Sequence, residues 1–196
     1  LFLASINLYF PTIKKNKTTM KSLLKFAAVF ALGFALSGSS AVAQERSGGN
    51  GLSPDAMVSQ TIFNKTTITV TYGRPGLKGR ELSSLAPADQ VWRTGANEAT
   101  AITFSTDVNF GGESVPAGTY VLYTIPGENW TFILNNKLTR GDGDDRPAWG
   151  SYGYDDSMDQ VRADAAVTVT DAPSMERFAI YFDTLTDNKA HLNLHW

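Results

Sequence analysis

The feature that most constrains the fold is a period-two alternation of apolar and polar residues, which begins near Met57. Ile68, Val70 and Tyr72 alternate with threonines, so the three apolar side chains share one face of an extended segment. The pattern returns in residues 102–110, 130–134, 167–169, 178–182 and 192–196, with turn residues between these segments. This spacing predicts an all-β domain, an antiparallel β-sandwich with jelly-roll-like topology.

Three segments depart from this alternation. Residues 119–125 are apolar on both faces, which is typical of a central strand. Residues 84–91 allow one short helical turn around Pro87. Residues 140–159 are rich in glycine and aspartate and predict a long loop, and loops of such length tend to be functional or disordered.

The N-terminal region has the pattern of a targeting signal. A basic start at Met20, an apolar segment at 26–36 and small residues at 41–43 predict a signal peptide over 20–43, cleaved before Gln44. The apolar segment is shorter than the roughly 20 residues that a membrane-spanning helix needs. We therefore expect an exported protein, periplasmic or secreted, without a membrane span.

The signal peptide sets the expected boundaries of the remaining segments. Residues 1–19 contain no methionine and precede a complete signal, so we interpret them as over-extended translation without a role in the fold. Residues 44–54 are polar and glycine-rich and predict a flexible leader. Residues 55–196 are then expected to form a single β-sandwich domain.

Composition narrows the classes of partner. The chain has no cysteine, which excludes a lipidated cysteine, disulfides and thiolate chemistry. Removing residues 1–43 removes five lysines and no acidic residue, which leaves 12 basic against 19 acidic residues and a net charge of −7. This charge argues against nucleic acid or an anionic membrane as a partner.

Several motifs in order resemble a known family. They are VSQTI at 58–62, VTYGRP at 70–75, VWRTGANEAT at 91–100 and PAGTY at 116–120. Over about residues 53–196 the chain resembles an uncharacterised exported bacterial family, domain of unknown function 2911. The resemblance implies export and a bacterial source, but no mechanism. Members of that family continue beyond the position of Trp196, so the resemblance implies that this chain is a fragment.

An arginine-rich region is the first candidate site. Arg74, Arg80 and Arg93 lie close in sequence, and guanidinium groups bind planar carboxylates and phosphates bidentately. If they converge, they form an anion pocket together with Asn97. Trp92 is then a ligand contact, and its alternative role is that of a core anchor.

The same region allows two other interpretations. The arginines can instead pair internally with Glu81, Asp89 and Glu98, which would leave no pocket. Glu98 can also act as a general acid or base of a hydrolase, with Arg93 and Asn97 as transition-state donors. Hydrolysis usually needs a second catalytic group, and the sequence indicates none.

Metal binding has one weak candidate. Asp142, Asp144 and Asp145 offer the oxygen ligands that calcium prefers, although their spacing is not that of an EF-hand, and a solvated acidic loop is the alternative. His191 and His195 on one strand would lie roughly 13 Å apart, too far for one metal ion to be held by both alone. We therefore expect no cofactor.

An aromatic group in the long loop is the second candidate site. Trp149 and Tyr152 lie among glycines, and exposed rings of this kind can stack on sugars. The alternative is that the rings fold back and cap one end of the sandwich. Taken together, these features predict a binding module for a small anion or a carbohydrate, without enzymatic activity. A hydrolase using Glu98 and a purely structural envelope protein are the alternatives.

Overall fold

The computed structural model describes residues 3–10, 46, 51–63, 65–168 and 174–196. The described residues are almost entirely β. Their strands are β1 (Leu3–Tyr9), β2 (Asp55–Ile62), β3 (Thr66–Gly73), β4 (Thr100–Phe104), β5 (Val108–Phe110), β6 (Glu113–Val115), β7 (Gly118–Ile125), β8 (Trp130–Asn135), β9 (Thr139–Gly141), β10 (Asp144–Pro147), β11 (Asp159–Thr168), β12 (Ala179–Asp183) and β13 (Lys189–His195). Two 3-10 turns, η1 (Leu82–Ser84) and η2 (Asp156–Met158), are the described helical elements.

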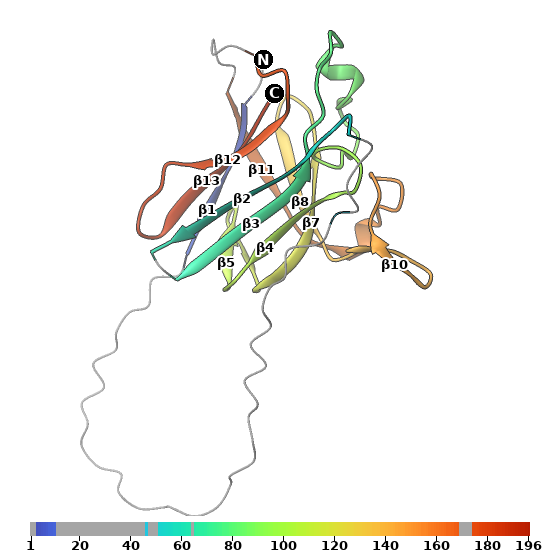
Figure 1. Ribbon diagram of the computed structural model, residues 1–196. Helices are drawn as coiled ribbons and strands as arrows, with labels where there is room; N and C mark the ends of the chain where they lie inside the picture. Colours follow the sequence, from blue (N-terminus) through green and yellow to red (C-terminus); the bar gives the residue numbers. More distant parts are fainter. Residues whose placement is uncertain (1–2, 11–45, 47–50, 64, 169–173) are drawn as a thin grey trace, which may run out of the picture.

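The main sheet is antiparallel and folds over into two packed layers (Figure 1). Its strand order is β12-β13-β1-β11-β8-β7-β4-β3-β2, and the β5–β6 hairpin pairs with β1. The predicted antiparallel β-sandwich is confirmed. Its larger layer is a meander in which β2, β3, β4, β7, β8 and β11 are neighbours in chain order, whereas a jelly-roll-like order was expected.

The main core lies between the two layers and is built from the alternating residues that the sequence indicated. Ile68 and Val70 of β3 are fully buried, and Tyr72 joins β3 to the opposite layer. The Tyr72 hydroxyl accepts a hydrogen bond from the backbone N–H of Ile180 at 3.0 Å, and its ring meets Phe178 edge-on at 5.8 Å between centroids. Period-two alternation therefore decides which face of each strand is buried in the core.

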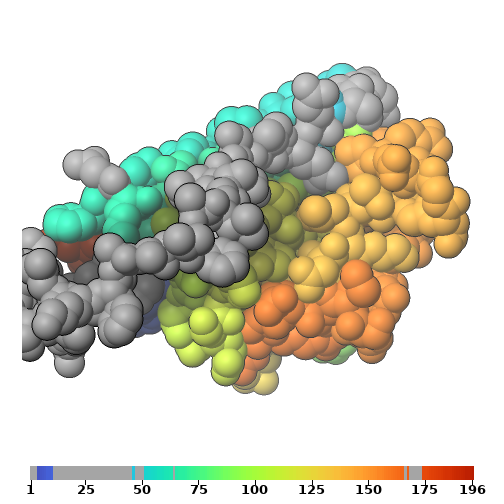
Figure 2. Space-filling model, turned by 90° about the horizontal axis from the view of Figure 1, so that it is seen from below, coloured from blue at the N-terminus to red at the C-terminus, as the bar shows by residue number. Residues whose placement is uncertain are grey.

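A smaller second core covers the outer face of β7 and β8. It contains Val121 and Tyr123 of β7 together with Ile133, Ala99 and Ala148. This explains why residues 119–125 are apolar on both faces. The covering element is the segment predicted as a long loop, which instead contains the β9–β10 hairpin and η2. The hairpin projects from the sandwich on the side away from β12 and β13 (Figure 1) and forms the light-orange shoulder in Figure 2.

The N-terminal segment differs from what the sequence analysis expected. Residues 1–19 were given no role, yet Leu3–Tyr9 forms β1 between β13 and β11. Ala4, Ile6 and Leu8 are buried in the main core, while Tyr9 on the other face is 43% exposed. The segment has the same period-two pattern as the other strands, so the interpretation of residues 1–19 as over-extended translation without a role in the fold does not hold for this strand.

The predicted signal peptide at 20–43 lies outside the described residues. Part of the predicted flexible leader is described, and Arg46 within it has a buried side chain. Among the described residues the helical elements are two short 3-10 turns, and neither could span a bilayer.

Candidate functional site

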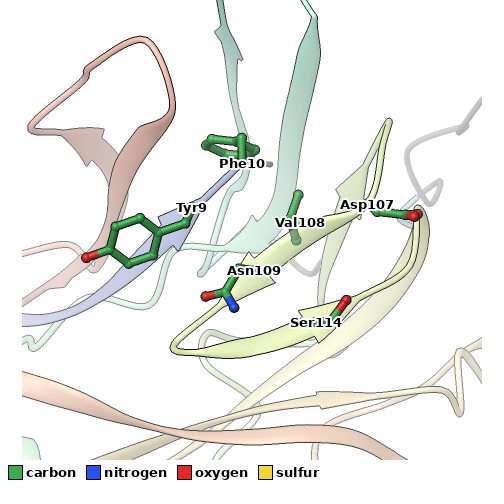
Figure 3. Close-up of a pocket in the computed structure, with 6 residues that line it drawn as sticks. All are labelled: Tyr9, Phe10, Asp107, Val108, Asn109 and Ser114. Carbon is green, nitrogen blue, oxygen red and sulfur yellow. The ribbon is translucent and has the colours of Figure 1, made fainter. Parts of the chain in front are cut away.

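One pocket opens beside the end of β1, away from the predicted site residues (Figure 3). Its volume is about 450 Å³, and it is lined by Tyr9, Phe10, Asp107, Val108, Asn109 and Ser114. Its acidic side chain is that of Asp107, which already accepts a hydrogen bond from the backbone N–H of Ala117 at 2.9 Å. Asn109 Oδ1 likewise accepts a hydrogen bond from the backbone N–H of Gly112 at 3.0 Å, so two of the polar side chains that line the pocket are already bonded to the backbone.

The Trp92–Glu98 loop is held in an unusual backbone conformation. Thr94 is fully buried with a φ of 54°, a left-handed value that is rare for a β-branched residue. Its hydroxyl shares a hydrogen bond of 3.1 Å with Thr124, and its carbonyl accepts one of 2.7 Å from Thr100. A Cβ on Gly73 would overlap the carbonyl oxygen of Ala96, so this glycine lets the loop lie against β3. Strain that surrounding contacts hold in place is a common property of functional sites.

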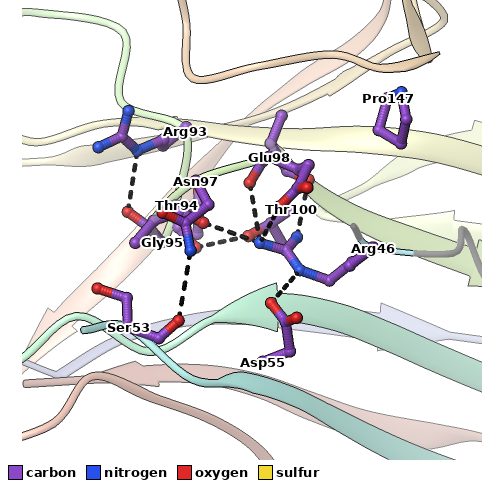
Figure 4. Close-up of polar contacts among 12 residues, drawn as sticks. Arg46, Ser53, Asp55, Arg93, Thr94, Gly95, Asn97, Glu98, Thr100 and Pro147 are labelled. Carbon is purple, nitrogen blue, oxygen red and sulfur yellow. Dashed lines mark hydrogen bonds and ion pairs between the residues drawn. The ribbon is translucent and has the colours of Figure 1, made fainter. Parts of the chain in front are cut away.

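The end of the loop contacts a buried guanidinium group, that of Arg46, which lies between Glu98 and Asp55 (Figure 4). Its Nη2 lies 3.3 Å from Glu98 Oε2 and donates to the carbonyl oxygen of Ala96 at 2.8 Å. Its Nε donates to Asp55 Oδ1 at 2.7 Å, and Nη1 donates to the Ala99 carbonyl at 3.3 Å. The side chains of Arg46 and Glu98 are only 6% and 2% exposed. Two carboxylates and several backbone carbonyls thus provide acceptors around one guanidinium group, and that group belongs to Arg46.

Arg74, Arg80 and Arg93 do not share such a site. Arg74 Nε donates to the carbonyl oxygen of Phe178 at 2.9 Å, and Arg80 donates to carbonyls of its own turn, with Nη2 at 2.7 Å from the oxygen of Gly76. Arg93 Nε donates to the Gly95 carbonyl at 3.3 Å. In the described residues none of the three forms an ion pair with a carboxylate. The sequence analysis also considered that these arginines pair with Glu81, Asp89 and Glu98. In the structure the three arginines bond to backbone carbonyl oxygens instead.

Trp92 takes the role of a core anchor. It is 6% exposed and stacks on Trp196 at 5.8 Å between ring centroids. Phe178 and Trp130 meet it edge-on at 5.2 and 6.4 Å. Its ring therefore lies among aromatic core residues.

The aromatic segment at 148–152 lies directly beside the Trp92–Glu98 loop. The backbone N–H of Gly150 donates to the Asn97 carbonyl at 3.0 Å, and a β-bridge joins Glu98 to Trp149. Asn97 itself donates from Nδ2 to the Ser53 carbonyl at 3.3 Å. The fold thus brings together four of the predicted site residues, Arg93, Asn97, Trp149 and Tyr152, from two distant segments.

Gly150 allows the exposed part of this site to form. Its φ is 63°, and a Cβ there would lie 2.9 Å from the Tyr152 ring and 3.0 Å from Nη1 of Arg93. Tyr152 is 88% exposed and Trp149 is 39% exposed. The guanidinium of Arg140 lies 5.5 Å from the centre of the Trp149 ring. Two cationic groups therefore each lie close to an exposed ring, Arg93 to Tyr152 and Arg140 to Trp149. We call these four residues the platform.

Burial acts on the pKa of Arg93 in the platform. Desolvation lowers the pKa of the Arg93 guanidinium from its ordinary value, and the nearby Tyr152 hydroxyl opposes this shift. An arginine keeps its proton at neutral pH despite such shifts, so Arg93 carries a positive charge. A half-buried cation beside an exposed ring can bind an anionic group more strongly than a fully solvated cation can.

The acidic residues predicted as calcium ligands lie in the β9–β10 hairpin. The carboxylate of Asp144 receives three hydrogen bonds from Arg146, two from its side chain at 2.8 and 2.7 Å and one from its backbone N–H at 3.0 Å. These bonds lower the pKa of Asp144 to about 2. Asp142 and Asp145 are exposed in the same hairpin. Among the described residues no group of three His, Asp or Glu side chains is arranged to hold a metal ion.

The comparison with known families decides the assignment of the chain. Residues 53–196, which are most of the sequence, match the family described as "Protein of unknown function (DUF2911)". The chain belongs to this family. No curated protein and no solved structure matches it.

A polar network under the platform holds the aromatic segment of this DUF2911 domain. Tyr154 donates to Asp159 Oδ2 at 2.7 Å, and Arg162 binds both of them, with Nε 2.7 Å from the same carboxylate. The ring of Tyr154 meets that of Tyr123 at 5.1 Å. Burial raises the pKa of Tyr123 to about 12, with the Asp159 charge as a second cause. Tyr154 is also raised to a pKa of about 12, by burial and by its bond to Asp159.

Tyr123 is expected to make the domain sensitive to alkali. Its folded-state pKa lies above the unfolded value near 10, so the folded state keeps a proton that the unfolded chain loses, and stability falls between pH 10 and about 12. For this buried group the fall is roughly 2–3 kcal/mol. Urea denaturation across this range should show a smaller fall for Tyr123→Phe than for the wild type. Tyr152→Phe, which removes an exposed hydroxyl group, is the control, and equal falls for all three proteins would contradict the assignment.

Sequence reasoning missed two arginines in and beside this site, Arg46 and Arg140. Arg46 was placed in a flexible leader because its neighbours are polar and glycine-rich, and no local pattern shows that its partners are Asp55 and Glu98. Arg140 was seen only as the start of a loop. No local pattern shows that Arg140 meets Trp149, because Trp149 lies beyond the end of β10.

Proposed function

We propose that the domain is an exported binding module whose ligand is an acidic saccharide, bound at the platform. The observation that carries this proposal is the exposed Tyr152 ring beside the Arg93 guanidinium. Aromatic rings stack on the apolar faces of sugar rings, while a guanidinium pairs with a carboxylate or sulfate on the same sugar. Arg140, whose guanidinium lies over the Trp149 ring, adds a second cation next to an aromatic ring.

The way in which the fold holds the two rings supports binding. The rings come from a segment that the backbone ties to the Trp92–Glu98 loop and that the second core holds from below. A rigid surface loses less conformational entropy when a ligand binds. Export is proposed from the sequence of residues 20–43, and it would place such a domain where glycans are available.

The hydrolase alternative has less support from the geometry. Glu98 is 1% exposed, and its carboxylate pairs with Arg46. A general acid or base must reach the proton that it transfers, directly or through one water molecule. A purely structural role remains the second candidate, and the binding experiment separates the two.

Binding should be measured by titration calorimetry with oligogalacturonate and with a neutral oligosaccharide of the same length. We expect the acidic ligand to bind more tightly and its affinity to fall with salt concentration. Tyr152→Ala should weaken binding about 3- to 10-fold through lost stacking. Arg93→Gln should weaken it about 10- to 100-fold.

The control variant is Phe63→Ala, which removes another exposed ring, 70% exposed, outside the platform. It should bind like the wild type. Equal affinity for the acidic and the neutral ligand would contradict the proposed role of the arginines in binding. If neither ligand binds, the binding proposal is wrong for this ligand class and the structural role is favoured.

A further inference from the structure

β1 occupies a groove between two strands that are far from it in sequence. It is antiparallel to β13 along its whole length, from Leu3 opposite His195 to Tyr9 opposite Lys189. On its other side it pairs first with β11, at Leu3–Ser5, and then with β5, at Leu8–Tyr9. The strand therefore has a partner on each side and completes the sheet between β11 and β13.

The groove buries the side chains at every second position of β1. Ala4, Ile6 and Leu8 are at most 2% exposed and Phe10 is 9% exposed, all within the main core. Gly111 makes space for one of them, because a Cβ there would lie 2.9 Å from Cδ1 of Ile6. A strand with another pattern, or shifted by one residue, would place polar groups in this core.

The contacts that hold β1 are non-covalent, and the chain that links it to the rest is long. Residues 11–45 lie between Phe10 and Arg46. The proposed cleavage between Ala43 and Gln44 falls in this stretch and would leave β1 without a covalent link to the domain. An open groove would then expose two strand edges and an apolar surface, which favours binding of another strand.

We propose that the groove between β11 and β13 is a strand-binding site. Its ligand is an extended peptide with apolar residues at alternate positions, and residues 3–10 are the occupant seen here. The site accepts this segment in trans, from a separate chain, by adding a strand to the two edges. Backbone pairing supplies affinity, and the pockets for Ile6 and Leu8 supply specificity.

The experiment uses the full chain with a protease site inserted between residues 20 and 43. After cutting, the protein is incubated with a fluorescent peptide of residues 3–10, in urea just below the unfolding midpoint, and passed over a sizing column. We expect one labelled peptide per domain. A peptide carrying Ile6→Asp and Leu8→Asp should bind at least about 100-fold more weakly, because it buries unpaired charges. A Tyr9→Ser peptide, changed on the exposed face, is the matched control.

Cross-linking tests the register, since the chain has no cysteine of its own. A peptide with Asn7→Cys should form a disulfide with His191→Cys, its partner across the strands, and not with His195→Cys. The second cysteine would lie roughly 13 Å further along the strand, beyond the reach of a disulfide.

Several outcomes would overturn the proposal. The first is a cut protein that stays folded but binds no peptide. The second is a peptide with Ile6→Asp and Leu8→Asp that binds as tightly as the unchanged peptide. The third is a disulfide that forms equally well at His191→Cys and His195→Cys. If the cut protein unfolds, it is refolded with and without the peptide. Recovery only with the peptide supports the site, and no recovery with it overturns the site.

Discussion

Replacing Arg46 by alanine should lower the free energy of unfolding by about 3–5 kcal/mol, because it removes a buried guanidinium group that pairs with the buried carboxylate of Glu98. The Glu98 side chain is 2% exposed, and Arg46 also bonds to Asp55 and to the carbonyls of Ala96 and Ala99. Urea denaturation of the full chain measures the loss. Methylguanidinium should raise the melting temperature of Arg46→Ala more than that of the wild type, because the vacated site fits a guanidinium group.

The matched control is Arg146→Ala. The Arg146–Asp144 ion pair is shorter than the Arg46–Glu98 pair, at 2.7 against 3.3 Å, but its arginine is 70% exposed. Solvent screens such a pair, so we expect little change in stability. The double variant Arg46→Met with Glu98→Gln should recover much of the loss, since no charge is then left buried. An equal loss for both single variants would contradict the role of burial.

Trp92→Ala is the second change with a large expected effect, also about 3–5 kcal/mol. Trp92 is 6% exposed and joins Trp196, Phe178 and Trp130 in one aromatic cluster at the end of the core. Its removal leaves a cavity that rigid neighbouring rings cannot fill. Chemical denaturation gives the loss, and near-ultraviolet circular dichroism should lose the signal of the stacked Trp92–Trp196 pair.

Trp149→Ala is the control for this prediction. Trp149 is 39% exposed, so removing it should cost about 1 kcal/mol or less. If both tryptophan variants lose the same stability, the aromatic cluster does not anchor the core. Trp92→Phe should lie between Trp92→Ala and the wild type, because it keeps part of the buried area.

The site was less predictable than the fold because its residues meet only in three dimensions. Arg93 and Tyr152 were each recognised from their residue type. Their approach depends on the second core, which places the 148–152 segment beside the Trp92–Glu98 loop. Arg74 and Arg80, which lie nearer to Arg93 in sequence, bond instead to carbonyl oxygens elsewhere.

The sequence by itself determined the class of structure, because a side chain's face on a strand follows from its position alone. Period-two alternation indicated the buried faces of β3 and β8. Residues 119–125 are apolar on both faces, which indicated a strand covered on both sides. The same alternation was present in residues 3–10 and was passed over when that segment was set aside.

Only the tertiary structure decided which strands are neighbours and which charges meet. β1 lies between β11 and β13, and Arg46 lies against Glu98, although each pair is far apart in sequence. Such choices depend on how whole surfaces fit and on which buried groups find partners. A local sequence pattern determines which face of a strand a side chain lies on, but it does not determine which residue that side chain contacts.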